Sequence, residues 1–270
     1  MPVVLIDWAD TLHLERRHDG QLHRHDLGPA LPPDDLCLRA ARSLQQASGT
    51  TLGADISILK QVPWGAGMGG GSSDAATTLL GLNKLWGLNW PRARLQTLAA
   101  QLGADVPFFV GGRNAFVEGI GDILTPMPVP TQRFAVIKPP QAIATAAIFS
   151  SPLVTRNTKP AIVAGSLADT VCERNQQQSF EGLLGGFGRN DLQAAAEALC
   201  PEVTQARQWL AQRFGNSRMT GSGSAVFARV EETGTGGQPV ATELEGTLPE
   251  GWVGRMCHSL LEHPLVGWAS

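Results

Sequence analysis

The sequence predicts an α+β fold, and three observations support that prediction. Segments with helical periodicity alternate with short β-prone segments along the 270 residues, which excludes an all-α or an all-β fold. Turn signals between neighbouring strands predict antiparallel pairing, which argues against a purely parallel sheet. The proline-rich stretch TPMPVPTQ, residues 125–132, has no periodicity and divides the chain. We therefore expect two domains, residues 1–128 and 129–270.

The composition indicates a globular protein without a membrane or nucleic-acid partner. Hydrophobic residues make up 43% of the chain and charged residues 17%. No apolar run approaches the roughly 18–20 residues that span a bilayer, and no basic leader precedes the first apolar stretch. The net charge of -3 provides no electrostatic footprint for general nucleic-acid binding. We expect a cytoplasmic protein, as a monomer or a homodimer.

The cysteines and histidines of the sequence lack the spacing that is typical of metal ligands. The four cysteines lie far apart without a C-x-x-C pair, so neither a zinc ribbon nor a redox motif is predicted. Four histidines cluster near the start of the chain, where a solvated strand face explains them better than a metal site. We predict no metal site formed by protein side chains.

The first elements follow from alternation and capping signals. Residues 3–15 are β-prone, a His-Asp-Gly turn follows, and residues 21–25 return, so we expect a hairpin. Residues 32–49 begin with acids and carry apolar side chains at a spacing of four, which predicts a helix ending at Gly49. Residues 54–62 alternate polar and apolar side chains and predict a half-buried strand.

Helical periodicity resumes after a glycine-rich loop. Apolar side chains from Ala75 to Trp86 recur at helical spacing, with Ser72 or Ser73 expected to cap the helix and Gly87 to end it. A second helix fits residues 91–102, since proline is accepted in a first turn. The next two segments, DVPFFV and NAFVEG, predict two short strands.

The second half repeats the mixture of strands and helices. Residues 134–140 predict a buried strand, and residues 191–199 and 202–214 predict helices. Residues 217–230 predict a strand, a tight glycine turn and a second strand. Residues 155–181 are polar and irregular, and no element is assigned to them.

The loop GAGMGGGSSDAA, residues 65–76, carries the strongest functional signal. A strand, a bare loop and a helix N-terminus together form an anion site, because free N–H groups and the helix dipole point to one place. Glycine allows the backbone to approach phosphate oxygens, which a side chain would prevent. The hydroxyls of Ser72 and Ser73 can add donors, or one of them can ligate a magnesium ion carried by a nucleotide.

Several phosphate loops can be compared with this segment. Gly65, Gly67 and Gly70 satisfy G-x-G-x-x-G, but no acid follows between residues 75 and 104 to bind a ribose. A Walker loop is excluded because no lysine lies between residues 60 and 84, and H-R-D and D-F-G motifs of protein kinases are absent. A glycine turn that only connects strand and helix remains the structural alternative.

The segment PWGAGMGGGSSDAA, residues 63–76, resembles the nucleotide loop of the GHMP kinases. GLNKLW, LGADVPFF, EGIGD, IKPP, ATAAIFSSP, FGRNDLQ, RMTGSGSAVFA and HPLVGW extend the resemblance over nearly the whole chain. It implies a two-domain fold, with an N-terminal domain like ribosomal protein S5 domain 2 and a C-terminal ferredoxin-like α/β sandwich. The branch it resembles phosphorylates the 2-hydroxyl of a cytidine diphosphate derivative of methylerythritol, a small molecule, for isoprenoid synthesis.

The resemblance also implies ATP and Mg²⁺ and assigns roles to residues. Asp105 is expected to take the proton of the substrate hydroxyl, although an Asp at a helix end can instead satisfy local N–H groups. Thr145 and Phe149 match positions near the cytidine, where an aromatic face stacks on a base, although a core phenylalanine is the alternative. The turn at 221–223 resembles the third motif of the family, beside the nucleotide loop, although a plain hairpin turn explains it equally well. The nucleotide is expected to contact Pro63, Gly65, Gly67, Met68, Gly69, Gly70, Gly71, Ser72 and Ser73.

One departure from the family pattern leaves alternatives open. The family begins with a P-A-K-x-N strand, whose lysine lies beside the catalytic carboxylate, and a G-Y-H segment, and neither occurs here. We expect a start codon assigned too far downstream, with a real truncation as the alternative. Without that lysine the chain could be a catalytically impaired nucleotide-binding module. A GHMP kinase for another alcohol is the third hypothesis, which GGGSSDAA and ADVPFF disfavour.

Overall fold

The chain forms two compact units that interleave along the sequence. The computed structural model describes residues 1–119, 121, 123–156, 189–230, 244 and 248–270. Unit 1 comprises residues 1–64, 69–131 and 259–270, and unit 2 comprises residues 65–68 and 132–258. The α+β class is confirmed, whereas the division into domains at residue 128 stays a prediction, as does the irregular character of 157–181, which lies outside the described residues. No helix in the described ranges is long and apolar enough to cross a membrane.

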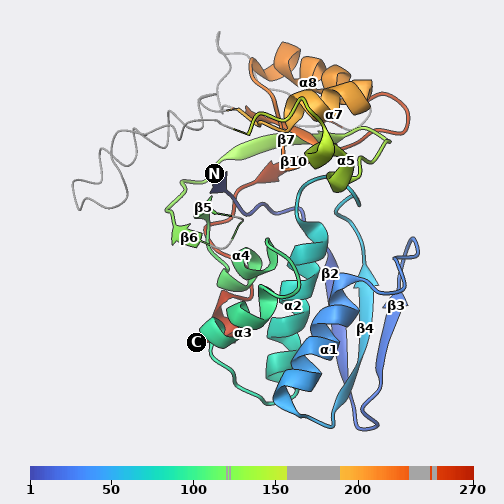
Figure 1. Ribbon diagram of the computed structural model, residues 1–270, viewed down its shortest axis with the longest axis vertical. Coiled ribbons are helices and arrows are strands. Elements are labelled where there is room, and N and C mark those ends of the chain that lie inside the picture. The colour runs from blue at the N-terminus through green and yellow to red at the C-terminus, as the bar shows by residue number, and fades with distance from the viewer. Residues whose placement is uncertain (120, 122, 157–188, 231–243, 245–247) are drawn as a thin grey trace, which may run out of the picture. The chain divides into compact units, whose positions relative to one another are not determined.

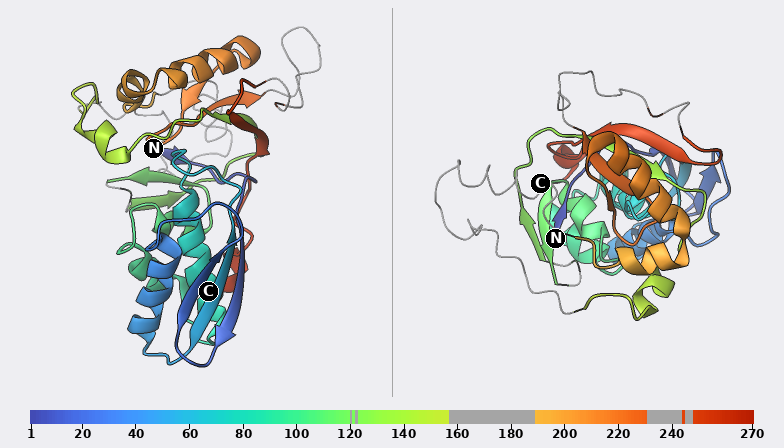
Figure 2. Two further views of the ribbon diagram at one scale, coloured as in Figure 1. Left: turned by 90° about the vertical axis from the view of Figure 1, so that its right-hand side faces the viewer. Right: turned by 90° about the horizontal axis from the view of Figure 1, so that it is seen from above.

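The larger sheet of unit 1 has the strand order β2-β4-β3. β4 (Gly53–Leu59) lies in the centre, antiparallel to β2 (Thr11–Arg17) and parallel to β3 (Leu22–Asp26). Ala54, Ile56 and Ile58 on β4 are almost fully buried. Helices cover one face of this sheet (Figures 1 and 2). The polar side chains of Arg17, His25 and Asp55 form ion pairs on the other face.

The predicted hairpin near the N-terminus is wrong, because β4 separates its two strands. On β2 and β3 the side chains are at most partly buried, whereas β4 carries the fully buried apolar residues. The most apolar strand takes the centre, where both of its edges are paired and one face is covered. The helix between β3 and β4 supplies the crossover that a parallel pair requires.

Four helices pack together in unit 1. The first begins after Asp35, whose carboxylate accepts the N–H of Leu38, and ends at Gly49 in the left-handed conformation, as predicted. The second has Gly87 with a positive φ just past its end, also as predicted. The bounds are α1 (Leu36–Ser48), α2 (Gly70–Leu85), α3 (Arg92–Ala99) and α4 (Val106–Gly111).

Residues 106–111 form a helix, so the strand predicted for DVPFFV is wrong. Six apolar residues fit a buried strand and a buried helix equally well by periodicity. The local signals favour the helix, since Pro107 lies in its first turn and Gly112 caps its end in the left-handed conformation. Packing on α2 and α3 buries Val106 and Val110, whereas Phe108 packs with Leu5 and Ala115.

A second sheet of unit 1 has the order β1-β5-β6 and is antiparallel throughout. The end of the chain returns to this unit, where Leu260 donates its N–H to the carbonyl of Leu5 at 2.8 Å. Arg92 of α3 donates to the carbonyls of Val110, Val266 and Ala269, which fixes the final turn. The bounds are β1 (Pro2–Val3), β5 (Ala115–Glu118), β6 (Ile123–Pro126) and the 3₁₀ turn η1 (Val266–Trp268).

Unit 2 contains an antiparallel sheet of order β10-β7-β9-β8, with helices on one face (Figure 1). α8 packs on β7 and β9 and buries Val203, Ala206 and Leu210. The predicted strand at 134–140, the two helices and the strand–turn–strand segment are all confirmed. The bounds are β7 (Arg133–Lys138), α5 (Thr145–Ser150), α7 (Gln193–Leu199), α8 (Pro201–Phe214), β8 (Arg218–Met219), β9 (Val226–Val230) and β10 (Val253–His258).

Candidate functional site: a bare helix start and a carboxylate

The start of α2 has no side-chain cap. Gly69 occupies the N-cap with a φ of +72°, a conformation that a residue with a Cβ rarely adopts, and no side chain bonds to the first amides. Ser72 and Ser73 lie inside the first turn, and the N–H of Ser73 bonds to the carbonyl of Gly69 at 2.9 Å. The prediction that a serine caps this helix is therefore wrong.

The uncapped turn gives this end of α2 the properties of an anion site. The first amides of an α-helix have no partner within the helix, and the aligned peptide dipoles leave partial positive charge there. Gly70, Ser72 and Ser73 keep part of their surface accessible, and Gly71 is exposed. The amides of Gly70, Gly71 and Ser72 and the hydroxyls of Ser72 and Ser73 can donate to the oxygens of a phosphate.

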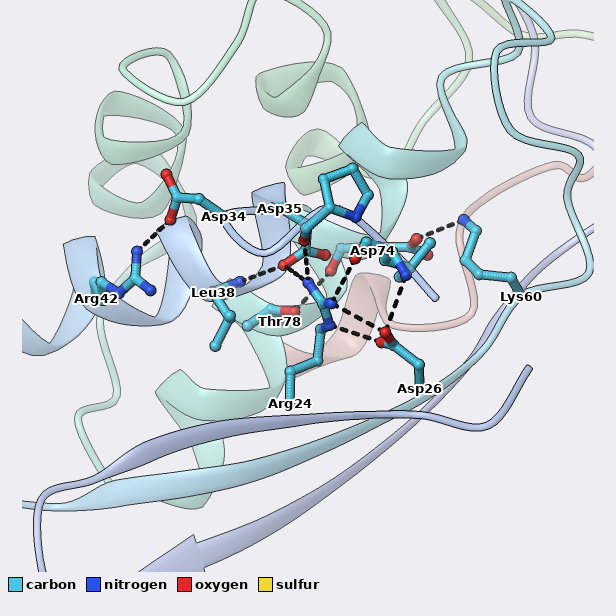
Figure 3. A network of polar contacts seen from close by, with 11 residues as sticks. Arg24, Asp26, Asp34, Asp35, Leu38, Arg42, Lys60, Asp74 and Thr78 are labelled. Carbon is cyan, nitrogen blue, oxygen red and sulfur yellow. Dashed lines mark hydrogen bonds and ion pairs between the residues drawn. The ribbon is translucent and has the colours of Figure 1, made fainter. Parts of the chain in front are cut away.

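Three buried ionic side chains lie at the base of this turn. Lys60 follows β4, Asp10 precedes β2 and Asp74 belongs to α2. The ammonium of Lys60 donates to Asp10. It also donates to Asp74 Oδ2 at 2.7 Å, as Figure 3 shows. Asp10 Oδ1 also accepts the N–H groups of Gln61 and Val62 at 2.6 and 2.8 Å. We call Asp10, Lys60 and Asp74 the ionic cluster.

Burial and the neighbouring charges shift the pKa values of Asp74 and Lys60 in the ionic cluster. Burial raises the pKa of Asp74, Lys60 opposes this shift, and the negative charge of Asp10 reinforces it. Burial disfavours the charge on Lys60, but the two carboxylates outweigh that effect and hold its pKa above the usual value. Two carboxylates thus share one ammonium at a place from which water is largely excluded.

A neighbouring network ties β3 to the start of α1. The guanidinium of Arg24 makes two hydrogen bonds with Asp26 and an ion pair with Asp35 at 2.9 Å (Figure 3). It also donates to the carbonyls of Leu31 and Pro32. These bonds hold the segment between β3 and α1, and they satisfy a guanidinium that is 8% exposed.

Asp105 stands at the start of α4 but does not cap it. It occupies the N-cap position, and its side chain makes no capping hydrogen bond. Among the described residues the structure thus shows no capping bond from Asp105, and its role as a base stays a prediction. The residue is exposed, while the protein atoms on one side of its carboxyl partly desolvate it and raise the pKa of Asp105. A carboxylate with no capping bond and a raised pKa can accept a proton.

α4 packs against the start of α2 through Phe109. A Cβ built on Gly69 would lie 2.9 Å from Cε2 of Phe109, so these two residues are in close contact. Phe109 follows Asp105 by four residues, which places both on the same side of a helical turn. The side of α4 that begins at Asp105 therefore packs against the glycine N-cap.

The first residues of the loop belong to unit 2, where they pair with the turn at 220–225. Ser224 and Ala225 donate their N–H groups to the carbonyls of Gly65 and Ala66 at 3.3 and 3.1 Å. A Cβ on Gly67 would lie 2.6 Å from the backbone nitrogen of Gly223 and 2.6 Å from the carbonyl oxygen of Thr220. The two glycine motifs, far apart in sequence, are thus packed backbone to backbone.

The segment after β7 supports the same turn. The buried ammonium of Lys138 donates to the carbonyls of Pro139 and Pro140 at 2.9 and 3.3 Å. The hydroxyl of Ser224 donates to the carbonyl of Gln141 at 2.6 Å. These bonds fix the backbone that leads from β7 to α5.

Thr145 and Phe149 lie four residues apart on α5, and both are exposed. The Thr145 hydroxyl lies 3.0 Å from that of Ser222 in the glycine turn. Phe149 is 52% exposed, whereas Ile148 beside it is fully buried in the core. Phe149 is therefore not a core residue, and its ring is available to a ligand.

Sequence reasoning missed the ionic cluster. Asp10 and Lys60 lie 50 residues apart, and no motif joins them. The available signal was local: Lys60 and Asp74 are charged residues that flank a segment without other charges. Pro63 and Met68 are half-buried at the sides of the loop, and no described contact distinguishes either of them. The contacts of the predicted loop residues with a nucleotide stay a prediction.

Comparisons with known proteins agree on one family. The model of the GHMP kinase N-terminal domain matches residues 35–113, and that of the C-terminal domain matches residues 168–238. A 4-diphosphocytidyl-2-C-methyl-D-erythritol kinase of Methylibium petroleiphilum is 59% identical over 98% of this chain and 87% of its own length. The protein of the same name from Variovorax paradoxus is 53% identical over 99% and 88%.

Solved structures support the same fold. A crystal structure of 4-(cytidine 5'-diphospho)-2C-methyl-D-erythritol kinase has a TM-score of 0.66 and 32% identity, over 84% of this chain and 78% of that one. The homoserine kinase of Cytophaga hutchinsonii has a TM-score of 0.65 over 96% and 88%, with 16% identity, and so supports the fold alone.

Replacing Gly67 by alanine should disrupt the packed glycine motifs. The new Cβ would meet backbone atoms at 2.6 Å in a left-handed conformation, so the turn at 220–223 must move. Gly49→Ala is the matched control, because it has a similar φ but open space around it, and the conformation alone costs about 1–2 kcal/mol. Thermal unfolding should show a clearly larger fall in Tm for Gly67→Ala. Equal falls would contradict the described contact.

Replacing Asp105 by asparagine should stabilise the fold at neutral pH. The folded state raises the pKa of Asp105, so ionisation opposes folding above the ordinary value near 3.9, and the cost vanishes below that value. The Tm of Asp105→Asn should exceed that of the unchanged protein at pH 7 and match it in acid.

The control for this prediction is Asp55→Asn, which should change the Tm at pH 7 in the opposite direction. Hydrogen bonds from His25 and Arg17 lower the pKa of Asp55, so its ionised form favours folding at neutral pH. Asp55→Asn should therefore lower the Tm at pH 7, and the difference should fade in acid. A destabilised Asp105→Asn protein at pH 7 would show that the carboxylate has a structural role.

Proposed function

The chain belongs to the GHMP kinase family, and from this premise we propose that it phosphorylates the 2-hydroxyl of 4-diphosphocytidyl-2-C-methyl-D-erythritol with ATP. The observation that carries the proposal is the 59% identity to a kinase of that name over 98% of the chain. This activity is a step in the synthesis of isoprenoid precursors. The geometry of the described residues supports each part of the reaction.

The loop and the first turn of α2 hold the phosphates of ATP. Amides that lack partners at the helix start, together with the helix dipole, favour an anion at this place. The glycines from Gly65 to Gly71 keep the backbone bare, so phosphate oxygens can approach to hydrogen-bond distance. Charge that develops on the transferred group is stabilised by donors that are already in position.

Asp105 is the catalytic base. As the substrate oxygen forms its bond to the γ-phosphorus and the bond from that phosphorus to the bridging oxygen breaks, the hydroxyl proton passes to the carboxylate. The carboxylate is free of a capping bond, and partial desolvation raises its pKa, which makes it a better proton acceptor. Its main contribution is to orient the hydroxyl.

The acceptor is bound through its cytosine on α5. The ring of Phe149 is exposed and can stack on a base, and the nearby hydroxyl of Thr145 can bond to a polar atom of the ligand. Sequence identity to kinases that are named for a cytidyl substrate supports the same assignment.

Magnesium would be held through the nucleotide rather than by a protein cage. The described residues contain no group of three His, Cys, Asp or Glu side chains suited to a metal ion. Mg²⁺ commonly takes phosphate oxygens, waters and only one or two protein ligands, so a hydroxyl of Ser72 or Ser73 at the helix start fits its needs. When bound, the ion would offset charge on the phosphates.

No observation on the described residues or the relatives favours a nucleotide-binding module without turnover. ATP as the phosphoryl donor follows from family membership, and Mg²⁺ remains part of this proposal. The cytoplasmic location and the monomeric or dimeric state stay predictions.

The test of this function is turnover of the cytidyl substrate with ATP, in the unchanged chain and in Asp105→Asn. The substitution should abolish turnover, at least 10³-fold by analogy with other proton-transfer groups, and leave ADP binding nearly unchanged. Asp19→Asn, in the exposed turn between β2 and β3, is the control and should keep full activity.

The pH profile provides a second readout of the same base. Below its pKa Asp105 carries a proton and cannot accept another, so kcat/KM should fall in acid with an apparent pKa above the ordinary 3.9. Retained turnover in Asp105→Asn would remove this residue from its role. No turnover by the unchanged chain, with ADP bound, would refute the proposed reaction.

Phe149→Ala should weaken binding of the acceptor. Loss of one stacked base is worth about 1–3 kcal/mol, so KM for the cytidyl substrate should rise about tenfold or more, with KM for ATP unchanged. Phe149→Trp should retain the lower KM. Leu153→Ala removes another exposed apolar side chain of unit 2 and should have no effect. A KM that Phe149→Ala leaves unaltered would contradict the stacking role.

A further inference from the structure

We propose that Lys60 is a positioning residue for the nucleotide: it joins the two ends of the glycine loop and so fixes the amides that receive the phosphates. This inference rests on the proposed function, because it assumes that the loop binds a nucleotide. It concerns a side chain that no motif indicated, and it assigns the ionic cluster of Asp10, Lys60 and Asp74 a task in binding.

The ion pair between Lys60 and Asp74 closes the glycine loop. Lys60 is the last residue before the loop segment, and Asp74 follows the loop on α2, 14 positions later. Their side chains meet at 2.7 Å, so the ion pair links the two ends of the segment 61–73. The same ammonium reaches Asp10, and Asp10 receives the N–H groups of Gln61 and Val62. Both ends are thereby tied to one cluster.

The ammonium of Lys60 also lies against the start of α2. A Cβ on Gly70, the first residue of α2, would lie 3.6 Å from Nζ of Lys60 and 3.1 Å from Cγ1 of Val62. The ammonium and the chain that Asp10 holds thus lie directly against the first turn. A change in the cluster would displace Gly70 and change the directions of the free amides. Positioned donors bind and stabilise phosphate only when those directions are correct.

The buried charges of the ionic cluster provide a defined geometry rather than stability. The side chains of Asp10 and Asp74 are 2% and 6% exposed, and that of Lys60 is 13% exposed. Buried ion pairs carry a large desolvation cost, and well-packed apolar residues in their place are often equally stable. The fold alone therefore does not require these ions. Directional bonds from one ammonium to two fixed carboxylates supply what apolar packing lacks, namely a defined geometry.

The effect of Lys60 is indirect. Two of the three donors of its ammonium are bonded to carboxylates, and the cluster as a whole is not cationic. Attraction of phosphate to the Lys60 charge would be largely cancelled by the two neighbouring carboxylates. The loop amides bind the phosphate, and Lys60 holds the loop.

The experiment compares ADP binding, measured by direct titration, with the KM for the cytidyl substrate. Lys60→Met should weaken ADP binding at least tenfold and leave the acceptor KM within twofold. Arg42→Met is the matched control, because it removes a cation on α1 that forms an exposed ion pair with Asp34. The ADP affinity and the acceptor KM should both stay unchanged. ADP affinity within twofold of the unchanged protein in Lys60→Met would overturn the proposal.

A second variant separates positioning from stability. Lys60→Met leaves two buried carboxylates, Asp10 and Asp74, without their ammonium and can impair folding. Lys60→Met with Asp74→Leu replaces the pair by apolar side chains, and Asp10 then keeps the N–H groups of Gln61 and Val62 as partners. This double variant should recover the Tm and still bind ADP at least tenfold more weakly. Recovery of both Tm and ADP affinity would show that the ion pair has only a structural role and would overturn the proposal.

The controls also separate this inference from the function on which it rests. If the unchanged chain binds ADP but does not phosphorylate the cytidyl substrate, the reaction is refuted and the ADP titrations still test Lys60. If the unchanged chain turns over and the stable double variant binds ADP normally, the role of Lys60 alone is refuted.

Discussion

The rest of the structure depends on one steric constraint, the lack of room for a Cβ in the glycine loop. At Gly67 the carbonyl of Thr220 and the nitrogen of Gly223 occupy the place that a side chain would take. At Gly69 the left-handed backbone turns the chain into α2, and the ring of Phe109 closes the remaining space. Any other residue would push these segments apart. The bare backbone that a phosphate requires is therefore also the backbone that the packing requires.

Local patterns predicted the parts of the fold whose signals lie close together in the sequence. Helices with caps at both ends, such as α1, were found because their signals lie within a few residues. The pairing of β2 and β3 with β4 was missed because turn signals describe neighbours in sequence, and the burial of Ile56 and Ile58 decides which strand is central. Residues 106–111 were misassigned because a short apolar run does not distinguish a helix from a strand without its packing partners.

The same limit applies to the candidate site. The glycines, the serines and Asp105 could be singled out from the sequence because their residue types and spacing match a known loop. The exposure of Phe149 could not, since a phenylalanine in an apolar helix is as compatible with a core as with a ligand. The bond between Lys60 and Asp10 could not be predicted for a different reason. An ion pair across 50 residues depends on which strands pair in the sheet, and that pairing was predicted incorrectly.

The site gathers features that each oppose folding. Glycines lose more backbone entropy than other residues, the start of α2 lacks a cap, Asp105 ionises with difficulty, and Asp10 and Asp74 are buried with one shared cation. The apolar core of unit 1, in which Leu44, Ile56, Leu79 and Leu95 are fully buried, offsets these costs. The core residues of α2 lie from Ala75 onward, past the amides of its first turn. Free donors and a free carboxylate persist because the core, and not the site, provides the stability.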